Sequence, residues 1–216
     1  QRFTTEIAGG RLTVLEVGIS DTAGTADFWV CDDRPVWSSF DRRIASRDGS
    51  RCHRVSVETR PFSSVLAERE AALYCKVDVE GFDHVCVAGI EPGTRPEYVS
   101  MELAEERGPD ADVLLLESRG YDAFKIVDQT TFRAVPRRPS LGDRLPARVR
   151  RRVDPGPSGH ASGSSGPIGP QTHGRWETAA DVKETWRALL QRFGGDGAVE
   201  PWQTWFDLHA TVRSGQ

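Results

Sequence analysis

The chain has 216 residues, of which 38% are hydrophobic and 28% are charged, and its formal net charge is -4. These values are ordinary for a globular domain with a sizeable core, and the charge argues against a general nucleic-acid binder. No apolar run reaches membrane-spanning length and no signal peptide precedes the first predicted strand, so we expect a cytoplasmic protein. The sequence starts in mid-pattern at Gln1, and we interpret it as the carboxyl-terminal part of a longer protein.

The first half of the chain predicts short strands separated by turns. An apolar, β-branched run at 12–19 lies between Gly9-Gly10 and Ser20-Asp21, so we expect a buried parallel strand there. The other predicted elements are a half-buried strand at 26–30, a loop at 31–50, a short strand at 55–57 and a helix from Pro61 to about Arg69.

The second half alternates strands with helices. Its predicted elements are a strand from Tyr74 that breaks at Glu80-Gly81, a helix at 82–90, a strand at 97–103, a helix at 109–119 capped by Gly120, and a strand at 121–127. This alternation predicts an α/β fold, in which a parallel sheet carries helices on both faces.

Residues 133–176 differ in character, because Pro, Gly, Ser and Arg dominate and no periodicity is present. Such a segment serves either as a lid over a substrate or as a linker. We expect it to be mobile without substrate and to fold over the bound substrate. Eight arginines between Arg133 and Arg152 suit either a phosphate-bearing or sulfated substrate or a solvated loop.

A helix and a strand are predicted near the end of the sequence. Thr178 is the expected N-cap, and Asp181 completes a shortened capping box. The apolar positions that share one helical face are Val182, Trp186, Leu189, Leu190 and Phe193. After Gly194-Gly195, a last strand at 205–210 places Asp207 and His209 on one face, where His209 is an alternative general base.

Acidic residues mark the carboxyl ends of two predicted strands. Asp78 and Glu80 flank the break before Gly81, at the edge where open α/β sheets bind ligands. In the alternative interpretation, Asp78 caps the next helix and Glu80 pairs with a surface arginine. Glu102 ends the following strand and could share a crevice with Asp78. Two close carboxylates can shift a pKa or hold a divalent cation, but no histidine has ligand spacing near them, and we predict no metal site.

The four cysteines, Cys31, Cys52, Cys75 and Cys86, form no C-x-x-C pair, and three of them sit in apolar patterns typical of strands or helices. This spacing does not favour a metal site or a disulfide framework. We therefore expect buried free thiols in a reducing cytosol.

Several motifs occur in the order found in one enzyme family. The run K-V-D-V-E-G-F-D at 76–83, with Val85 and Gly89 after it, resembles the signature K-[IV]-D-[IV]-E-G-x-E-x-x-V-x-x-G of FkbM-type methyltransferases. Residues 18–28 resemble the A-L-S-D-x-x-G-x-x-x-F segment of that family, and Ser38-Ser39 resembles its S-S-L element. The family's first strand and glycine-rich loop, D-[IV]-G-A-N-x-G, do not occur in this sequence.

This resemblance implies a Rossmann-like class I methyltransferase sheet, incomplete at the N-terminus and completed by a late antiparallel strand. It also implies S-adenosylmethionine as the methyl donor and a small-molecule or sugar hydroxyl as the acceptor. Asp78, Glu80 and Glu102 would be catalytic, with Asp78 accepting the hydroxyl proton or orienting the substrate. Gly18, Ser20 and Asp21 would border the adenine, and Asp78 would also face the cofactor, although Gly18–Asp21 also suits a plain turn. Nucleic acids and membranes are not expected as partners.

We divide the chain into a partial methyltransferase core at 1–132, a loop or lid at 133–176, and a helix and final strand at 177–216 that complete the same domain. The chain as given is expected to be inactive by itself, because the glycine-rich loop would contact the cofactor. Two other functions stay open. One is a non-catalytic Rossmann-like binding domain, and the other is a hydrolase that uses the paired acids without a methyl donor.

Overall fold

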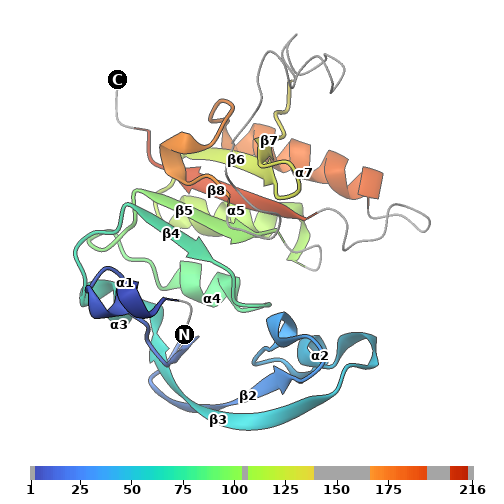
Figure 1. The fold of residues 1–216 in the computed structure, drawn as a ribbon. Coiled ribbons are helices and arrows are strands. Elements are labelled where there is room, and N and C mark those ends of the chain that lie inside the picture. Colours follow the sequence, from blue (N-terminus) through green and yellow to red (C-terminus); the bar gives the residue numbers. More distant parts are fainter. Residues whose placement is uncertain (1–2, 104–106, 139–165, 194–204, 214–216) are drawn as a thin grey trace.

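The structure is a computed structural model that describes residues 3–103, 107–138, 166–193 and 205–213. Its strands form two sheets, one with three strands in the order β1-β3-β2 and one with five in the order β4-β5-β8-β6-β7 (Figure 1). The chain is therefore mixed α/β, as its alternating pattern predicts. None of the described helices is long and apolar enough to cross a membrane.

The small sheet is built around a long hairpin. Strand β2 (Gly24–Cys31) pairs antiparallel with β3 (Cys52–Pro61), and β1 (Gly18–Ser20) pairs parallel with the end of β3. Helix α1 (Thr4–Ala8) precedes this sheet and α3 (Phe62–Ala67) follows it. The hairpin connection, expected as a plain loop, carries the 3-10 turns Pro35–Trp37 and Arg47–Gly49 and helix α2 (Arg42–Ala45).

The predicted buried strand at 12–19 is wrong for most of its length. Only β1 forms, and the side chains of Val14 and Leu15 are 60% and 39% exposed. Apolar β-branched residues favour a strand only where a neighbouring strand and a packed face are available. Strand β3 offers a partner only to Gly18 and Ile19 at the end of this run, and to Ser20 after it.

The large sheet combines parallel and antiparallel pairs. Strands β4 (Tyr74–Val77) and β5 (Tyr98–Glu102) are parallel, and β8 (Phe206–Thr211) runs antiparallel between β5 and β6 (Ala123–Asp128). The short strand β7 (Arg133–Ala134) pairs with the end of β6. The last predicted strand is thus confirmed, and it lies in the interior of the sheet.

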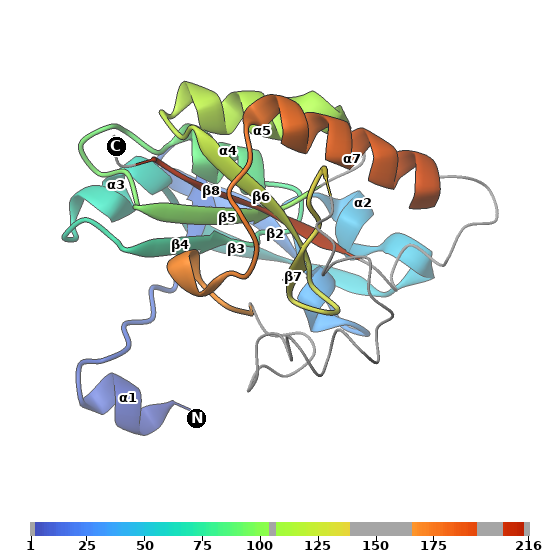
Figure 2. The ribbon, with the colours of Figure 1, turned by 90° about the horizontal axis from the view of Figure 1, so that it is seen from above.

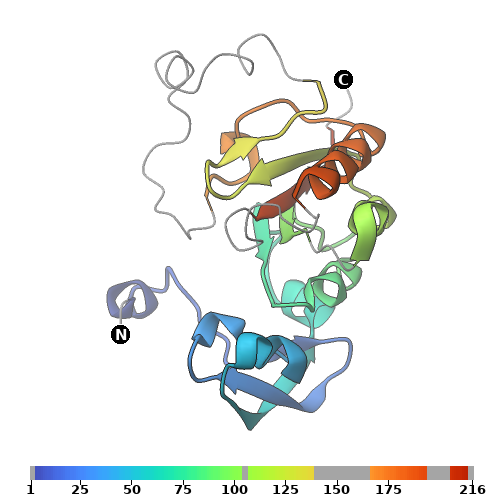
Figure 3. The ribbon, with the colours of Figure 1, turned by 90° about the vertical axis from the view of Figure 1, so that its right-hand side faces the viewer.

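Three helices cover one face of the large sheet: α4 (Asp83–Ala88), α5 (Gly108–Ser118) and α7 (Ala179–Phe193) (Figures 1 and 3). Helices α5 and α7 pack side by side (Figure 2). The core lies between these helices and the strands, with Val87, Leu116 and Trp186 packed against side chains that include Met101 and Leu208. The expectation of helices on both faces is wrong for the described residues, because the described α-helices that pack on the sheet all share this apolar face; the opposite face carries only the short 3-10 helix Gly169–Gln171.

The opposite face of the sheet is polar. Because side chains alternate along a strand, Lys76, Ser100, Asp207, His209 and Lys125 point away from the helices. The segment 166–177 is held against the same strands, since Glu177 bridges to Phe124 and the backbone of Gly169 lies against the Tyr98 ring. The part of the predicted lid that is described is therefore packed on the sheet, while its centre, at 139–165, lies outside the described residues.

The start of α7 agrees with its predicted cap. The hydroxyl of Thr178 accepts a hydrogen bond from the backbone N–H of Asp181 at 3.2 Å and donates one to the carboxylate of that residue at 2.9 Å. The first of these bonds satisfies one backbone donor that a helix leaves unpaired in its first turn, and the second joins the two side chains. Val182, Trp186 and Leu189 are buried as the helical spacing predicts. Gly194-Gly195 and the Phe193 side chain lie outside the described residues.

We expect Leu208→Ala to destabilise the fold strongly. Leu208 lies in the interior strand β8 with 0% exposure, and truncation would leave a cavity that costs roughly 2 to 5 kcal/mol of unfolding free energy. Leu114→Ala on α5 is the matched control, because Leu114 is 54% exposed and its loss should change stability by about 0.5 kcal/mol or less. Urea unfolding of both variants measures the difference. Equal losses would show that β8 is not in the core.

Candidate functional site

The chain makes a strained turn at Glu80-Gly81, directly after β4, and a residue of the small sheet holds this turn in place. Glu80 and Gly81 both have left-handed backbone conformations, with φ of 45° and 91°, and Glu80 lacks glycine's freedom to adopt one. The hydroxyl of buried Ser39 donates a hydrogen bond to the Glu80 carbonyl at 2.8 Å. Ser39 belongs to the hairpin connection of the small sheet. That connection therefore fixes the backbone at the carboxyl end of β4.

Apolar contacts support the same junction. The Phe40 ring packs edge-on against Phe28, with ring centroids 5.1 Å apart, and lies 5.3 Å from the Phe82 ring. A Cβ at Gly18 would lie only 2.4 Å from the Phe40 ring, so β1 approaches this cluster closely because residue 18 has no side chain. The two sheets therefore meet through aromatic packing next to the turn at Glu80-Gly81.

Acidic side chains converge at the carboxyl ends of β4 and β5. Asp78 is exposed, and its carboxylate lies 3.9 Å from the ammonium of Lys76. The same ammonium donates a hydrogen bond to Asp207 on β8, at 2.5 Å. Burial opposes the charge of Lys76, but the attraction of Asp207 and Asp78 raises its pKa. One lysine thus ties together acids from two different strands.

Glu102 and Asp207 are direct cross-strand neighbours. The Leu103 N–H donates to the Phe206 carbonyl, which makes the Glu102–Asp207 register pair a non-hydrogen-bonded one, the kind with the closer side chains. Burial, followed by the negative charges of Asp78, Glu80 and Asp207, raises the pKa of Glu102 to about 7. Burial also raises the pKa of Asp207 to about 6, against the opposing effect of Lys76. Glu102 is therefore the carboxyl in this cluster that can exchange a proton near neutral pH.

Glu80 has a partner on the small sheet. Its carboxylate forms an ion pair with Arg47 at 3.3 Å, and burial together with the neighbouring acids raises its pKa despite that partner. The Arg47 guanidinium lies 4.3 Å from the centre of the Trp37 ring, and Arg34 stacks on the same ring at 4.2 Å. A pair between Glu80 and a surface arginine is the sequence-based alternative to a catalytic role, and the structure contains such a pair. The ion pair also keeps the Glu80 carboxylate within the acid cluster.

The structure brings the predicted catalytic acids together but not all of the predicted cofactor residues. Electrostatic coupling links Glu102 with Asp78, Glu80, Asp83 and Asp207. Ser20 and Asp21 lie on the small sheet instead, where the Ser20 hydroxyl bonds to the exposed Asp21 carboxylate at 3.1 Å. Ser20 is the last residue of β1, and Asp21 begins the bend that leads from β1 to β2.

Sequence reasoning missed Lys76 and Arg47 as members of the site and treated Asp207 only as a neighbour of His209. The period-two alternation of β4 and β8 could have placed Lys76 and Asp207 on the same face, but only the strand order brings them into contact. Nothing in the sequence around Arg47 indicates its ion pair with Glu80, which is distant along the chain.

His209, the alternative general base, lies buried on the polar face of β8. It is 1% exposed, and burial lowers its pKa to about 3, so the imidazole is neutral. Its ring stacks on Tyr74 with 6.5 Å between ring centroids, and the Tyr74 hydroxyl bonds to Ser100 at 2.6 Å. The His209 Nε2 atom has no hydrogen-bond partner among the described residues. The side chain therefore fills the polar face of the sheet rather than facing solvent.

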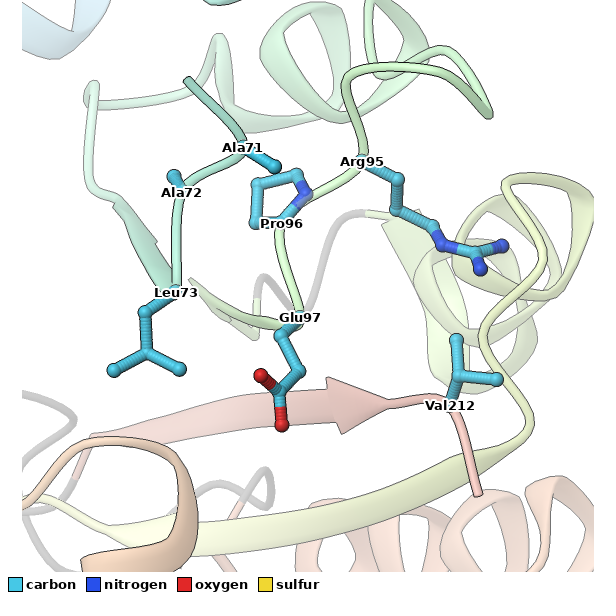
Figure 4. Close-up of a pocket in the computed structure, with 7 residues that line it drawn as sticks. All are labelled: Ala71, Ala72, Leu73, Arg95, Pro96, Glu97 and Val212. Atoms are coloured by element: carbon cyan, nitrogen blue, oxygen red, sulfur yellow. The ribbon is translucent and has the colours of Figure 1, made fainter. Parts of the chain in front are cut away.

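A surface hollow of about 420 Å³ lies at the other end of the sheet (Figure 4). Its lining includes Leu73 and Glu97, which precede β4 and β5, and Val212, which follows β8. Ligands of open α/β sheets bind at the carboxyl ends of the parallel strands, where this hollow does not lie. We therefore place the candidate site at the acid cluster.

In the part of the chain that the structure describes, no three His, Cys, Asp or Glu side chains are arranged to hold a metal ion. In comparisons with known proteins, the chain matches no family model, no curated protein and no solved structure.

Gly81→Ala should weaken the site's supporting turn. An alanine at this left-handed position costs roughly 1 to 2 kcal/mol, and its Cβ would lie 2.6 Å from the Ile44 Cδ1 atom. Gly93→Ala is the control, since nothing lies within 4 Å of a Cβ there. Thermal unfolding should show a clear drop in the midpoint for Gly81→Ala alone. A midpoint equal to that of the control would contradict the strained-turn assignment.

Proposed function

We propose that the chain is part of an S-adenosylmethionine-dependent O-methyltransferase of the FkbM type, which methylates a hydroxyl of a small molecule or sugar. The observation that carries this proposal is the acid cluster at the carboxyl ends of β4 and β5, in a sheet whose last strand, β8, is inserted antiparallel beside β5. This strand arrangement agrees with the late antiparallel strand that the motif resemblance implies.

The charge of the site suits such a cofactor. S-adenosylmethionine, when bound, supplies an electrophilic methyl group on a cationic sulfur. The acid cluster places five carboxylates (Asp78, Glu80, Asp83, Glu102 and Asp207) near two cations (Lys76 and Arg47), so it attracts positive charge. Asp78 is the exposed acid among them and would hold polar groups of the cofactor or acceptor. By the resemblance, Gly18, Ser20 and Asp21 would border the adenine.

In this proposal Asp78 and Glu102 have different roles toward the acceptor hydroxyl. Asp78 is exposed, so it can accept a hydrogen bond from the acceptor hydroxyl and orient it. Glu102, with its pKa raised to about 7, can take up the hydroxyl proton at neutral pH, where a general base works best. Lys76 and Arg47 hold Asp207 and Glu80 in place beside it.

Asp78→Asn should lower methyl transfer in the full-length protein by roughly 10²-fold, because the neutral amide no longer offers an anionic oxygen that holds and orients the acceptor hydroxyl. Cofactor affinity by calorimetry and the thermal midpoint should stay near the wild-type values. The same chemical change at exposed Asp27, which pairs with Arg54 on the small sheet, is the control and should leave turnover unchanged. Wild-type turnover in Asp78→Asn would contradict the proposed role of Asp78. Acceptor binding with no methyl transfer by the wild type would instead indicate the non-catalytic binding domain.

The pH profile tests Glu102 separately. A base must be ionised to act, so turnover should fall as the pH drops below about 7, where Glu102 becomes protonated. Asp207→Asn removes a negative charge that raises the pKa of Glu102, so the acid limb should move to lower pH. Glu80→Gln should move it in the same direction and avoids the buried Asp207 site. A limb that stays in place while turnover falls at every pH would mean that these acids have only a structural role.

A further inference from the structure

Two cysteines of the small sheet face each other across the hairpin. Cys31 ends β2 and Cys52 begins β3, and the two residues are register partners. The Asp32 N–H donates to the Arg51 carbonyl at 2.9 Å, and this bond flanks the cysteine pair. In antiparallel strands that pattern makes Cys31 and Cys52 a non-hydrogen-bonded pair. Both thiols are free in this structure.

This register suits a covalent bond. Opposite residues of an antiparallel pair project from the same face, and Cα atoms of a non-hydrogen-bonded pair are about 4.5 Å apart. Disulfides join cysteines whose Cα atoms are about 4.4 to 6.8 Å apart. The backbone of the hairpin therefore already holds the two residues at a separation that a disulfide accepts.

Cys31 and Cys52 differ in their exposure to solvent. Cys31 is 0% exposed, and its sulfur accepts a hydrogen bond from the Arg34 N–H at 3.3 Å. Cys52 is half-buried, so a small oxidant can reach it from solvent. By contrast, burial raises the pKa of Cys75 to about 11 and that of Cys86 to about 12, which suppresses their reactive thiolate forms.

We propose that Cys31 and Cys52 form an intramolecular disulfide, so that this hairpin is a site of reversible thiol oxidation. The Cys52 thiolate attacks a low-molecular-weight disulfide such as oxidised glutathione, forming a mixed disulfide and releasing one glutathione thiolate. The Cys31 thiol then attacks the Cys52 sulfur, loses its proton and releases the second glutathione as a thiol. The two protein thiols are oxidised and one glutathione disulfide is reduced to two thiols, so atoms and electrons balance.

The bond would close the loop of residues 32–51. That loop carries Ser39, Ile44 and Arg47, which contact the turn at Glu80-Gly81. Closing a loop restricts the unfolded chain more than the folded one, so oxidation should raise the thermal midpoint. The cross-link thus lies at the base of the element that supports the candidate site, whatever reaction that site performs.

The test is to treat the reduced, folded chain with oxidised glutathione, block remaining thiols by alkylation and digest it with trypsin without reduction. Trypsin releases Cys52 in the short peptide Cys52–Arg54, because Arg51 precedes it. We expect this peptide joined to the peptide that contains Cys31, loss of two hydrogens from the intact mass, and a higher thermal midpoint that reductant reverses.

Matched variants separate this pair from the other thiols. The double variant Cys75→Ser/Cys86→Ser should still form the cross-link, whereas Cys52→Ser should not show the shift in midpoint on oxidation. The proposal is overturned if Cys31 and Cys52 stay alkylatable in the folded protein, or if the cross-link forms only in denaturant. A bond between Cys75 and Cys86, or between two chains, in place of the expected one would also overturn it.

Discussion

The ion pair between Lys76 and Asp207 is the interaction on which the large sheet and its acidic edge both depend. It joins β4 to β8 across the intervening strand β5, where the small, fully buried Ser100 is the register partner of Lys76 and leaves room for the lysine chain. Asp207 is 1% exposed, so loss of Lys76 would leave a buried carboxylate without its cation. The Lys76 ammonium also faces the Asp78 carboxylate, so its positive charge offsets part of the repulsion between the neighbouring acids.

The acid cluster is also held from the small sheet. The hairpin connection supplies a hydroxyl to the Glu80 carbonyl, a guanidinium to the Glu80 carboxylate and an aromatic ring to the junction with Phe82. These contacts fix a turn whose backbone is unfavourable for a glutamate. A strained, externally supported turn beside coupled acids is a typical arrangement at functional sites, where conformation is set by the surroundings rather than by local preference.

Burial determines which acid can exchange a proton. Asp78 faces solvent, while Glu102 and Asp207 stand opposite each other in the interior half of the cluster. Burial raises the pKa of both carboxyls; the charges of neighbouring acids add to this effect, and Lys76 opposes it for Asp207. His209 lies on the same face of β8, and burial lowers its pKa to about 3. Chemically similar side chains therefore acquire different roles from their positions in one sheet.

The sequence by itself determined the local elements: strand β4 with its break at Glu80-Gly81, the cap of α7 at Thr178, and the alternation of β8 all follow from short-range patterns. Only the tertiary structure decided which elements pair. The run at 12–17 is apolar but has no strand beside it, and Lys76 meets Asp207 only because β8 enters the sheet next to β5. Hydrophobic spacing reports which face of an element is buried, whereas strand order depends on packing between segments far apart in the chain.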